Sequence, residues 1–178
     1  MKKWIVLMAL VLLPALAQAD VVNVNVYSGF VAAGGGAPYS GFVGSFTSPD
    51  INFANPFLPF GQVNFGADMT GFLNVASDGS YTFNLTSDDG SLLYIDGSLI
   101  VDDSGIHGPA SASGSVALTA GVHSFEVQYF ECCGLPAQIQ LTLPGGVNYV
   151  PEPGVLTLLG STGLLGIVGS FRKKFTLL

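Results

Sequence analysis

Short runs of alternating apolar and polar side chains dominate residues 20–149. Four of them lie at residues 22–26, 81–86, 123–129 and 138–143. Side chains alternate between the two faces of a strand, so each run predicts a strand with one buried face. No stretch of this segment repeats apolar residues at helical spacing.

Turn-forming residues separate these runs. Asp96-Gly97, between two apolar runs, predicts a tight hairpin. Many short strands with frequent turns predict an all-β fold, an antiparallel β-sandwich of jelly-roll-like type. Residues 28–66 are rich in Gly, Pro, Ser and Phe, and we expect long loops there with one or two short strands.

Charge is distributed unusually along the chain. All five Lys and Arg residues lie near the termini, and residues 20–149 contain 11 of the 12 acidic residues, for a formal charge of −11. Nothing in this segment can neutralise phosphates, which excludes nucleic-acid binding. Clustered carboxylates must therefore remain solvated, bind a proton or bind a metal cation. An acidic, soluble extracellular surface is the simpler alternative and needs no metal.

The N-terminus has the organisation of a secretory signal peptide. Lys2 and Lys3 precede an apolar stretch of 12 residues, Ile5 to Leu16, and Ala17-Gln18-Ala19 supplies the small-x-small cleavage pattern. We expect residues 1–19 to be removed by signal peptidase after export across the inner membrane. The folded domain is then expected at residues 20–149.

The C-terminal residues 150–178 contain three elements in order. Val150-Pro151-Glu152-Pro153 precedes the apolar stretch Val155 to Phe171, which ends at Arg172-Lys173-Lys174. As a helix, this stretch would be about 25 Å long, near the minimum for a transmembrane anchor. The pattern resembles the PEP-CTERM sorting signal that exosortase reads in Gram-negative bacteria. That resemblance implies transient membrane anchoring, followed by release to the cell surface or extracellular matrix.

The two cysteines, Cys132 and Cys133, are adjacent. Export makes their oxidation possible, but such a pair cannot link distant segments. A vicinal disulfide, two buried thiols and intermolecular bonds are the alternatives. Zinc binding by these cysteines with His107 and His123 lacks the usual Cys-x-x-Cys spacing.

The densest polar motif is Ser87-Asp88-Asp89-Gly90, at the end of an expected strand. Adjacent carboxylates suit calcium, which prefers several oxygen ligands, and we take Asp88 and Asp89 as candidate ligands. Glu131, Asp102 and Asp103 are further candidates. Alternatively, the aspartates accept backbone N–H bonds and shape turns.

Several blocks of sequence together resemble the protective-antigen (PA, fourteen-kilodalton) domain, a β-sandwich of toxins, glycosidases and microbial adhesins. They are 79–83, 87–91, 93–97, 120–123 and 129–131, and the best match spans residues 65–143. In lectin-type members an aspartate pair, often joined by a cis peptide, holds calcium that ligates sugar hydroxyls. The resemblance places that role on Asp88 and Asp89. It places Cys132, Cys133 and Gly134 in a second loop lining the site, which lacks the asparagine of adhesin members.

No catalytic motif of a hydrolase, metalloprotease or phosphate-binding enzyme occurs in the sequence. Glu126 and Glu131 are five residues apart, which puts them on opposite faces of a regular strand and argues against a glycosidase pair. We expect His123 to be a core histidine and His107 to be a turn residue near the site. We therefore expect a non-enzymatic exported module that binds extracellular polysaccharide or another glycan with calcium. A structural matrix protein without a soluble ligand is the alternative.

Overall fold

The computed structural model describes residues 21–54, 64–134 and 136–152. The predicted signal peptide, the apolar C-terminal stretch and its basic cluster lie outside these residues. The described elements are β1 (Val22–Val31), η1 (Ala32–Gly34), β2 (Gly36–Ser48), β3 (Asn52–Ala54), β4 (Phe65–Val75), β5 (Gly79–Asp88), β6 (Ser91–Ile95), β7 (Ser98–Asp103), β8 (Ala110–Leu118), β9 (Gly121–Glu131), β10 (Gln138–Thr142) and β11 (Val147–Val150).

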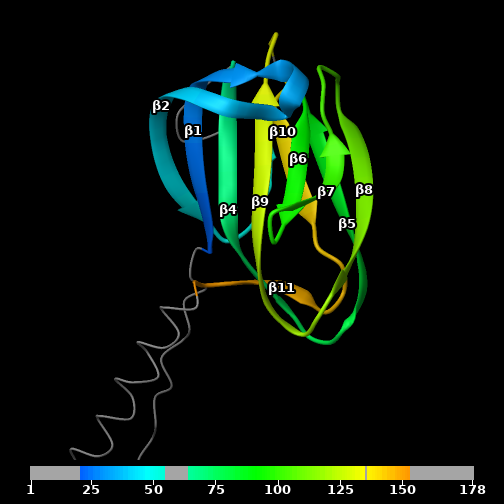
Figure 1. Cartoon of the computed structure of the whole chain (residues 1–178). Helices are drawn as coiled ribbons and strands as arrows, with labels where there is room; N and C mark the ends of the chain where they lie inside the picture. The colour runs from blue at the N-terminus through cyan, green and yellow to red at the C-terminus, as the bar shows by residue number, and fades with distance from the viewer. Residues whose placement is uncertain (1–20, 55–63, 135, 153–178) are drawn as a thin grey trace, which may run out of the picture.

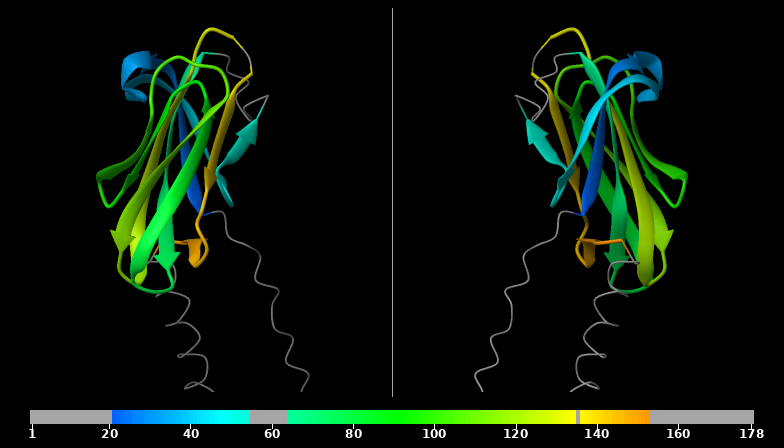
Figure 2. Two further views of the ribbon diagram at one scale, coloured as in Figure 1. Left: turned by 90° about the vertical axis from the view of Figure 1, so that its right-hand side faces the viewer. Right: turned by 90° about the vertical axis from the view of Figure 1, so that its left-hand side faces the viewer.

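The strands form two antiparallel sheets that pack face to face (Figures 1 and 2). The larger sheet has the order β2-β1-β4-β9-β6-β7, with β11 also paired to β4, and the smaller has the order β3-β10-β5-β8. The predicted all-β antiparallel sandwich is therefore confirmed. No helix among the described residues is long and apolar enough to cross a bilayer.

The core lies between the sheets and is built by the predicted alternation. On β4, Met69 and Leu73 are fully buried, whereas the alternate residues Thr70, Phe72 and Asn74 are partly exposed. Phe83 and Leu85 of β5 point into the same core from the smaller sheet. Burial of these large apolar side chains is the dominant favourable term in folding, about 1.5–3 kcal/mol for each.

The expectation of long loops over residues 28–66 is wrong for most of the part that is described. β1 continues to Val31, and β2 is a strand of 13 residues. Its N-terminal half crosses the outer face of the larger sheet, where the Tyr39 hydroxyl donates to Ala67 O at 3.0 Å and accepts from Tyr129 N at 3.0 Å. The rings of Tyr27 and Tyr39 stack with centroids 4.9 Å apart. These contacts join distant segments, so no local pattern predicts them.

Both ends of the described domain pair with neighbouring positions of β4. Val22 of β1 lies opposite Gly71, and Val150 of β11 lies opposite Phe72. β11 thus continues the position of β1 along the same side of β4. The start of β1 and the end of β11 consequently lie near each other, toward one end of the sandwich (Figure 1).

Candidate metal centre

Three strand ends meet at the opposite end of the sandwich. β5 ends at Asp88, β6 begins at Ser91, and β9 ends at Glu131. The register places Ser91 opposite Tyr129, so the turn between β5 and β6 lies beside the end of β9. Phe130 N donates to Gly90 O at 3.0 Å, which extends this pairing into the turn.

This arrangement gathers three carboxylates. One oxygen each of Asp88, Asp89 and Glu131 lies within 4.8 Å of the others. The side chains are withdrawn from solvent, with exposed fractions of 6% for Asp88, 4% for Asp89 and 0% for Glu131. The peptide bond between Asp88 and Asp89 is cis, the feature that the resemblance implied.

Main-chain donors hold Asp89 from two sides. His107 N donates to Asp89 Oδ1, and Cys132 N donates to Asp89 Oδ2, each at 2.9 Å. The hydroxyl of Tyr129 donates to Asp88 O at 2.5 Å and lies 3.4 Å from Glu131 Oε2. The Asp88-Asp89 turn is therefore connected to the loop around residue 107 and to the end of β9.

Within this cluster, two buried carboxylate oxygens have no hydrogen-bond partner among the described residues, namely Asp88 Oδ2 and Glu131 Oε1. Burial, followed by the charges of Asp89 and Asp88, raises the pKa of Glu131 to about 8. Burial and then Asp89 also raise the pKa of Asp88, against a smaller opposite effect of His107. Both shifts result from burial of the carboxyl groups and, second, from their closeness to one another.

The donor set fits calcium. All three side chains offer hard oxygen atoms, and calcium takes six to eight of them at flexible geometry. No Lys or Arg lies between residues 20 and 149, so no such side chain can neutralise the cluster in place of a metal ion. Three carboxylates supply at most six oxygens, which leaves room in the coordination shell for water or a ligand hydroxyl.

Gly90 is required by close approach of the chain. A Cβ atom at this position would lie 2.6 Å from Gly105 O and 2.5 Å from the Phe130 ring. The absence of a side chain lets the loop around residue 105 pack against the turn that carries the aspartates.

Two of the candidate ligands lie outside this cluster. Asp103 Oδ2 accepts a hydrogen bond from Ser87 Oγ at 2.9 Å, and Asp102 Oδ1 accepts one from Ser104 N at 3.0 Å. Asp102 therefore shapes the turn after β7, and Asp103 joins the end of β7 to β5.

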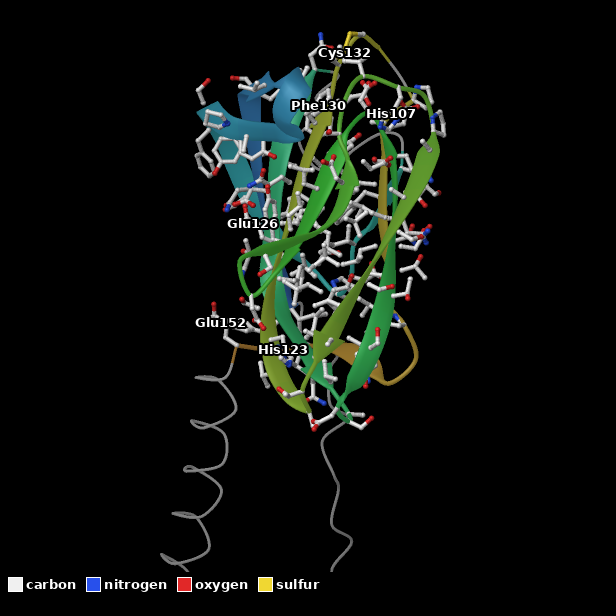
Figure 3. All side chains as sticks on the ribbon, turned by 45° about the vertical axis from the view of Figure 1, so that its right-hand side comes forward. His107, His123, Glu126, Phe130, Cys132 and Glu152 are labelled. Atoms are coloured by element: carbon white, nitrogen blue, oxygen red, sulfur yellow. A yellow bond between two sulfur atoms is a disulfide. The ribbon has the colours of Figure 1, made fainter. Side chains whose placement is uncertain are left out.

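The second predicted loop does lie at the cluster. Cys132 and Cys133 form a disulfide beside Asp89, followed by exposed Gly134. His107 is a turn residue of the neighbouring loop, as expected, and Figure 3 shows it at the same end of the sandwich as Cys132.

Sequence analysis missed the role of Tyr129 and the serine pair. Ser91 Oγ donates to Ser87 Oγ at 2.7 Å, beneath the aspartate turn. Tyr129 precedes Glu131 by two residues, so strand periodicity places both on the inner face, a signal that could have identified it. His123 is not a purely apolar core residue, since its ring nitrogens contact Asp96 Oδ2 at 2.6 Å and Thr119 O at 2.9 Å.

Comparison with known proteins gives a consistent family assignment. A family model described as the PA14 domain matches residues 44–152. No curated protein matches the sequence.

Solved structures share the fold. An anti-sigma factor domain-containing protein has 25% identity and a TM-score of 0.61 over 78% of this chain, which spans only 48% of that protein. The PA14 sugar-binding domain from an RTX adhesin has 19% identity and a TM-score of 0.57, covering 74% of this chain and 94% of that one. An epithelial adhesin domain from Candida glabrata in complex with beta-lactose has 13% identity and a TM-score of 0.51, covering 76% and 82%.

Proposed function

The chain belongs to the PA14 domain family, and from this premise we propose that it is a calcium-dependent carbohydrate-binding module. Asp88, Asp89 and Glu131 would hold the ion. Vicinal hydroxyl groups of a sugar would occupy the free coordination positions of the bound calcium. The module is proposed to bind without catalysing a reaction.

The observation that carries this proposal is the buried carboxylate cluster with its two unpartnered oxygens. Burying ionised carboxylates without a counterion is costly, and removing the charge requires either protons or a cation. Backbone donors to both oxygens of Asp89 fix its orientation without neutralising the cluster. Calcium would satisfy Asp88 Oδ2 and Glu131 Oε1 together.

The surroundings of the cluster suit a sugar ligand. Ile106, next to His107, is 62% exposed and offers an apolar surface at the rim. The Cys132-Cys133 disulfide lies on the other side of Asp89 and gives a second such surface. The sugar-binding domain of the RTX adhesin and the lactose-bound adhesin domain have the same fold, which supports a glycan as the ligand.

The position of the site supports a role outside the cell. The cluster adjoins Cys132, which Figure 3 shows at the end of the sandwich far from Glu152, the last described residue. If residues 155–171 anchor the chain before exosortase acts at residues 150–153, the site points away from the membrane. We propose export through the N-terminal signal and placement at the cell surface or in an exopolysaccharide matrix. A structural matrix protein without a soluble ligand is the competing function.

A glycan array separates these functions. The full-length protein should bind a defined set of glycans with calcium, and the signals should vanish with a chelator. Asp88→Asn combined with Asp89→Asn should abolish the same signals while the variant stays folded. Absence of any glycan signal with calcium would favour the structural role. Signals that survive both the chelator and the double substitution would refute the metal-dependent site.

A further inference from the structure

A concave site separate from the metal centre lies on the outer face of the larger sheet. It is a groove of about 370 Å³, and its lining includes Asn23, Thr70, Phe72, Tyr94, Glu126 and Glu152. These side chains come from β1, β4, β6, β9 and the segment after β11. Figure 3 shows Glu126 and Glu152 on one side of the sandwich, away from Cys132 and the metal centre.

Four of the lining residues form one row across adjacent strands. Asn23 lies opposite Thr70, Thr70 lies opposite Glu126, and Glu126 lies opposite Tyr94. Neighbouring strands are about 4.8 Å apart, so the row spans about 14 Å. It presents an amide, a hydroxyl, a carboxylate and a phenol to one extended ligand.

The groove also has aromatic surface. Tyr94 on β6 and Phe72 on β4 are both partly exposed and line the groove. Sites for ring-shaped polar ligands such as sugars typically combine aromatic rings with a few hydrogen-bonding groups.

The charge of the groove selects among sugars. Glu126 and Glu152 line it, and no Lys, Arg or His belongs to its lining. Gln128 Nε2 donates to Glu126 Oε1 at 2.6 Å, which orients this carboxylate without neutralising it. Asp68 lies two residues before Thr70 on the same face of β4, but burial and then the charge of Glu126 raise its pKa to about 6, so it adds negative charge only above that pH. Glycans with carboxylates or sulfates are repelled, whereas protonated amines are attracted.

We propose that this groove binds an amino-sugar polysaccharide through its protonated amines, independently of calcium. Glu126 and Glu152 pair with the amines, Asn23 and Thr70 bond to ring hydroxyls, and Tyr94 and Phe72 contact the ring faces. The inference goes beyond the proposed metal-dependent function, because it shares no residue with the cluster of Asp88, Asp89 and Glu131. The chain would then hold two glycan sites, at one end and on one face of the sandwich.

The test compares two oligosaccharides that differ in N-acetylation, which replaces each protonated amine by a neutral acetamide. Glucosamine oligomers and N-acetylglucosamine oligomers of equal length are titrated into the full-length protein by calorimetry, with chelator present, at a mildly acidic pH that protonates the amines. The glucosamine oligomer should bind and the acetylated one should bind at least about fivefold more weakly, as expected for the loss of two partly exposed charge pairs, with Glu126 and Glu152.

Variants assign the binding to the groove. Glu126→Gln should lower the affinity for the glucosamine oligomer about threefold to fivefold, and Tyr94→Ala should lower it about tenfold. Both side chains are partly exposed on the outer face, so melting temperatures should change little. Asp88→Asn is the matched control and should bind the oligomer like wild type.

Four results would overturn the proposal. One is no binding of the glucosamine oligomer, and another is equal binding of the two oligomers. The third concerns a lysine oligomer of equal charge. If it binds as tightly as the sugar and loses the same affinity in Tyr94→Ala, the groove is a site for basic peptides. Loss of oligomer binding in Asp88→Asn would assign the sugar to the metal centre instead.

Discussion

Cys132 N donates a 2.9 Å hydrogen bond to Asp89 Oδ2 and thereby connects the loop after β9 to the turn after β5. His107 N binds the other oxygen of the same carboxylate. One aspartate thus fixes the relative positions of three segments that are far apart in the sequence. A change in the charge of this cluster should therefore affect both metal affinity and fold stability.

Calcium should stabilise the protein specifically. Extracellular calcium sites commonly have dissociation constants near 0.1–1 mM, and at about 0.1 mM the addition of 1 mM calcium stabilises the fold by roughly 1.4 kcal/mol. For a domain of this size, we expect a rise of about 3 °C in melting temperature. Differential scanning calorimetry measures the shift, with magnesium at equal ionic strength as control. Asp88→Asn with Asp89→Asn should abolish the calcium-specific part. An equal shift with magnesium would show that the cluster does not select calcium.

Glu131→Gln should separate metal binding from folding. At neutral pH without metal, the raised pKa of Glu131 keeps much of this carboxyl group protonated, so glutamine is a close substitute. The free energy of unfolding should change by less than about 1 kcal/mol, while calcium affinity falls about tenfold or more. Glu126→Gln is the matched control, because Glu126 lies in the groove outside the cluster. If Glu131→Gln binds calcium as tightly as wild type, Glu131 is not a calcium ligand.

The metal-free protein should lose stability as the pH rises from about 5 to about 8. The folded state keeps the proton of Glu131 up to a pKa of about 8, whereas the unfolded chain releases it near the ordinary glutamate pKa of 4.5. Across this interval the folded state binds more protons, so stability falls with increasing pH. Calcium competes with that proton for Glu131. If binding releases one proton, the calcium affinity should rise by at most about tenfold per pH unit. Urea unfolding over this range, with and without calcium, measures both trends. A flat metal-free profile, or no difference between wild type and Glu131→Gln, would contradict the assigned cause.

The pair His123 and Asp96 should give a separate pH dependence. The carboxylate of Asp96, followed by the carbonyl of Thr119, raises the pKa of His123 above 6.5, while partial burial opposes the shift. Both ring nitrogens face acceptors, so the imidazolium is the form that this geometry satisfies. The stabilisation is complete below the unfolded pKa and is lost as the pH rises through the folded one.

The matching experiment is a proton NMR titration of His123 in wild type and in Asp96→Asn. Asp96→Asn should lower the pKa of His123 and cost about 0.5–1 kcal/mol of stability at acidic pH, with less effect at alkaline pH. Asp103→Asn, beside the other histidine, should leave the pKa of His123 unchanged. An unshifted pKa in Asp96→Asn would exclude the pair as the source of the dependence.

Local patterns predicted much of the fold and part of the site. Alternation along β5 and β9 gave the sandwich, and Asp96-Gly97 forms the predicted hairpin, with Ile95 opposite Ser98. The course of β2 could not be predicted, because Tyr39 is held by backbone atoms of β4 and β9. The pairing of β6 with β9 brings Glu131 to Asp88 and Asp89, and no local pattern predicts it. Asp102 and Asp103 do not belong to this cluster.

The remaining prediction concerns the segment after β11. β11 ends at Val150, so Pro151 and Glu152 directly follow a strand paired to β4, with no linker between the domain and the proposed sorting motif. Replacing Pro151, Glu152 and Pro153 together by alanine preserves the spacing to the apolar stretch and removes the motif. If exosortase recognises it, the substituted chain should stay in the membrane fraction at full length, whereas wild type is shortened and released. Fractionation followed by intact-mass measurement distinguishes the two, and Asp88→Asn, which leaves the motif unchanged, should be processed like wild type. A substituted chain that is released and has the wild-type mass would show that residues 151–153 do not direct sorting.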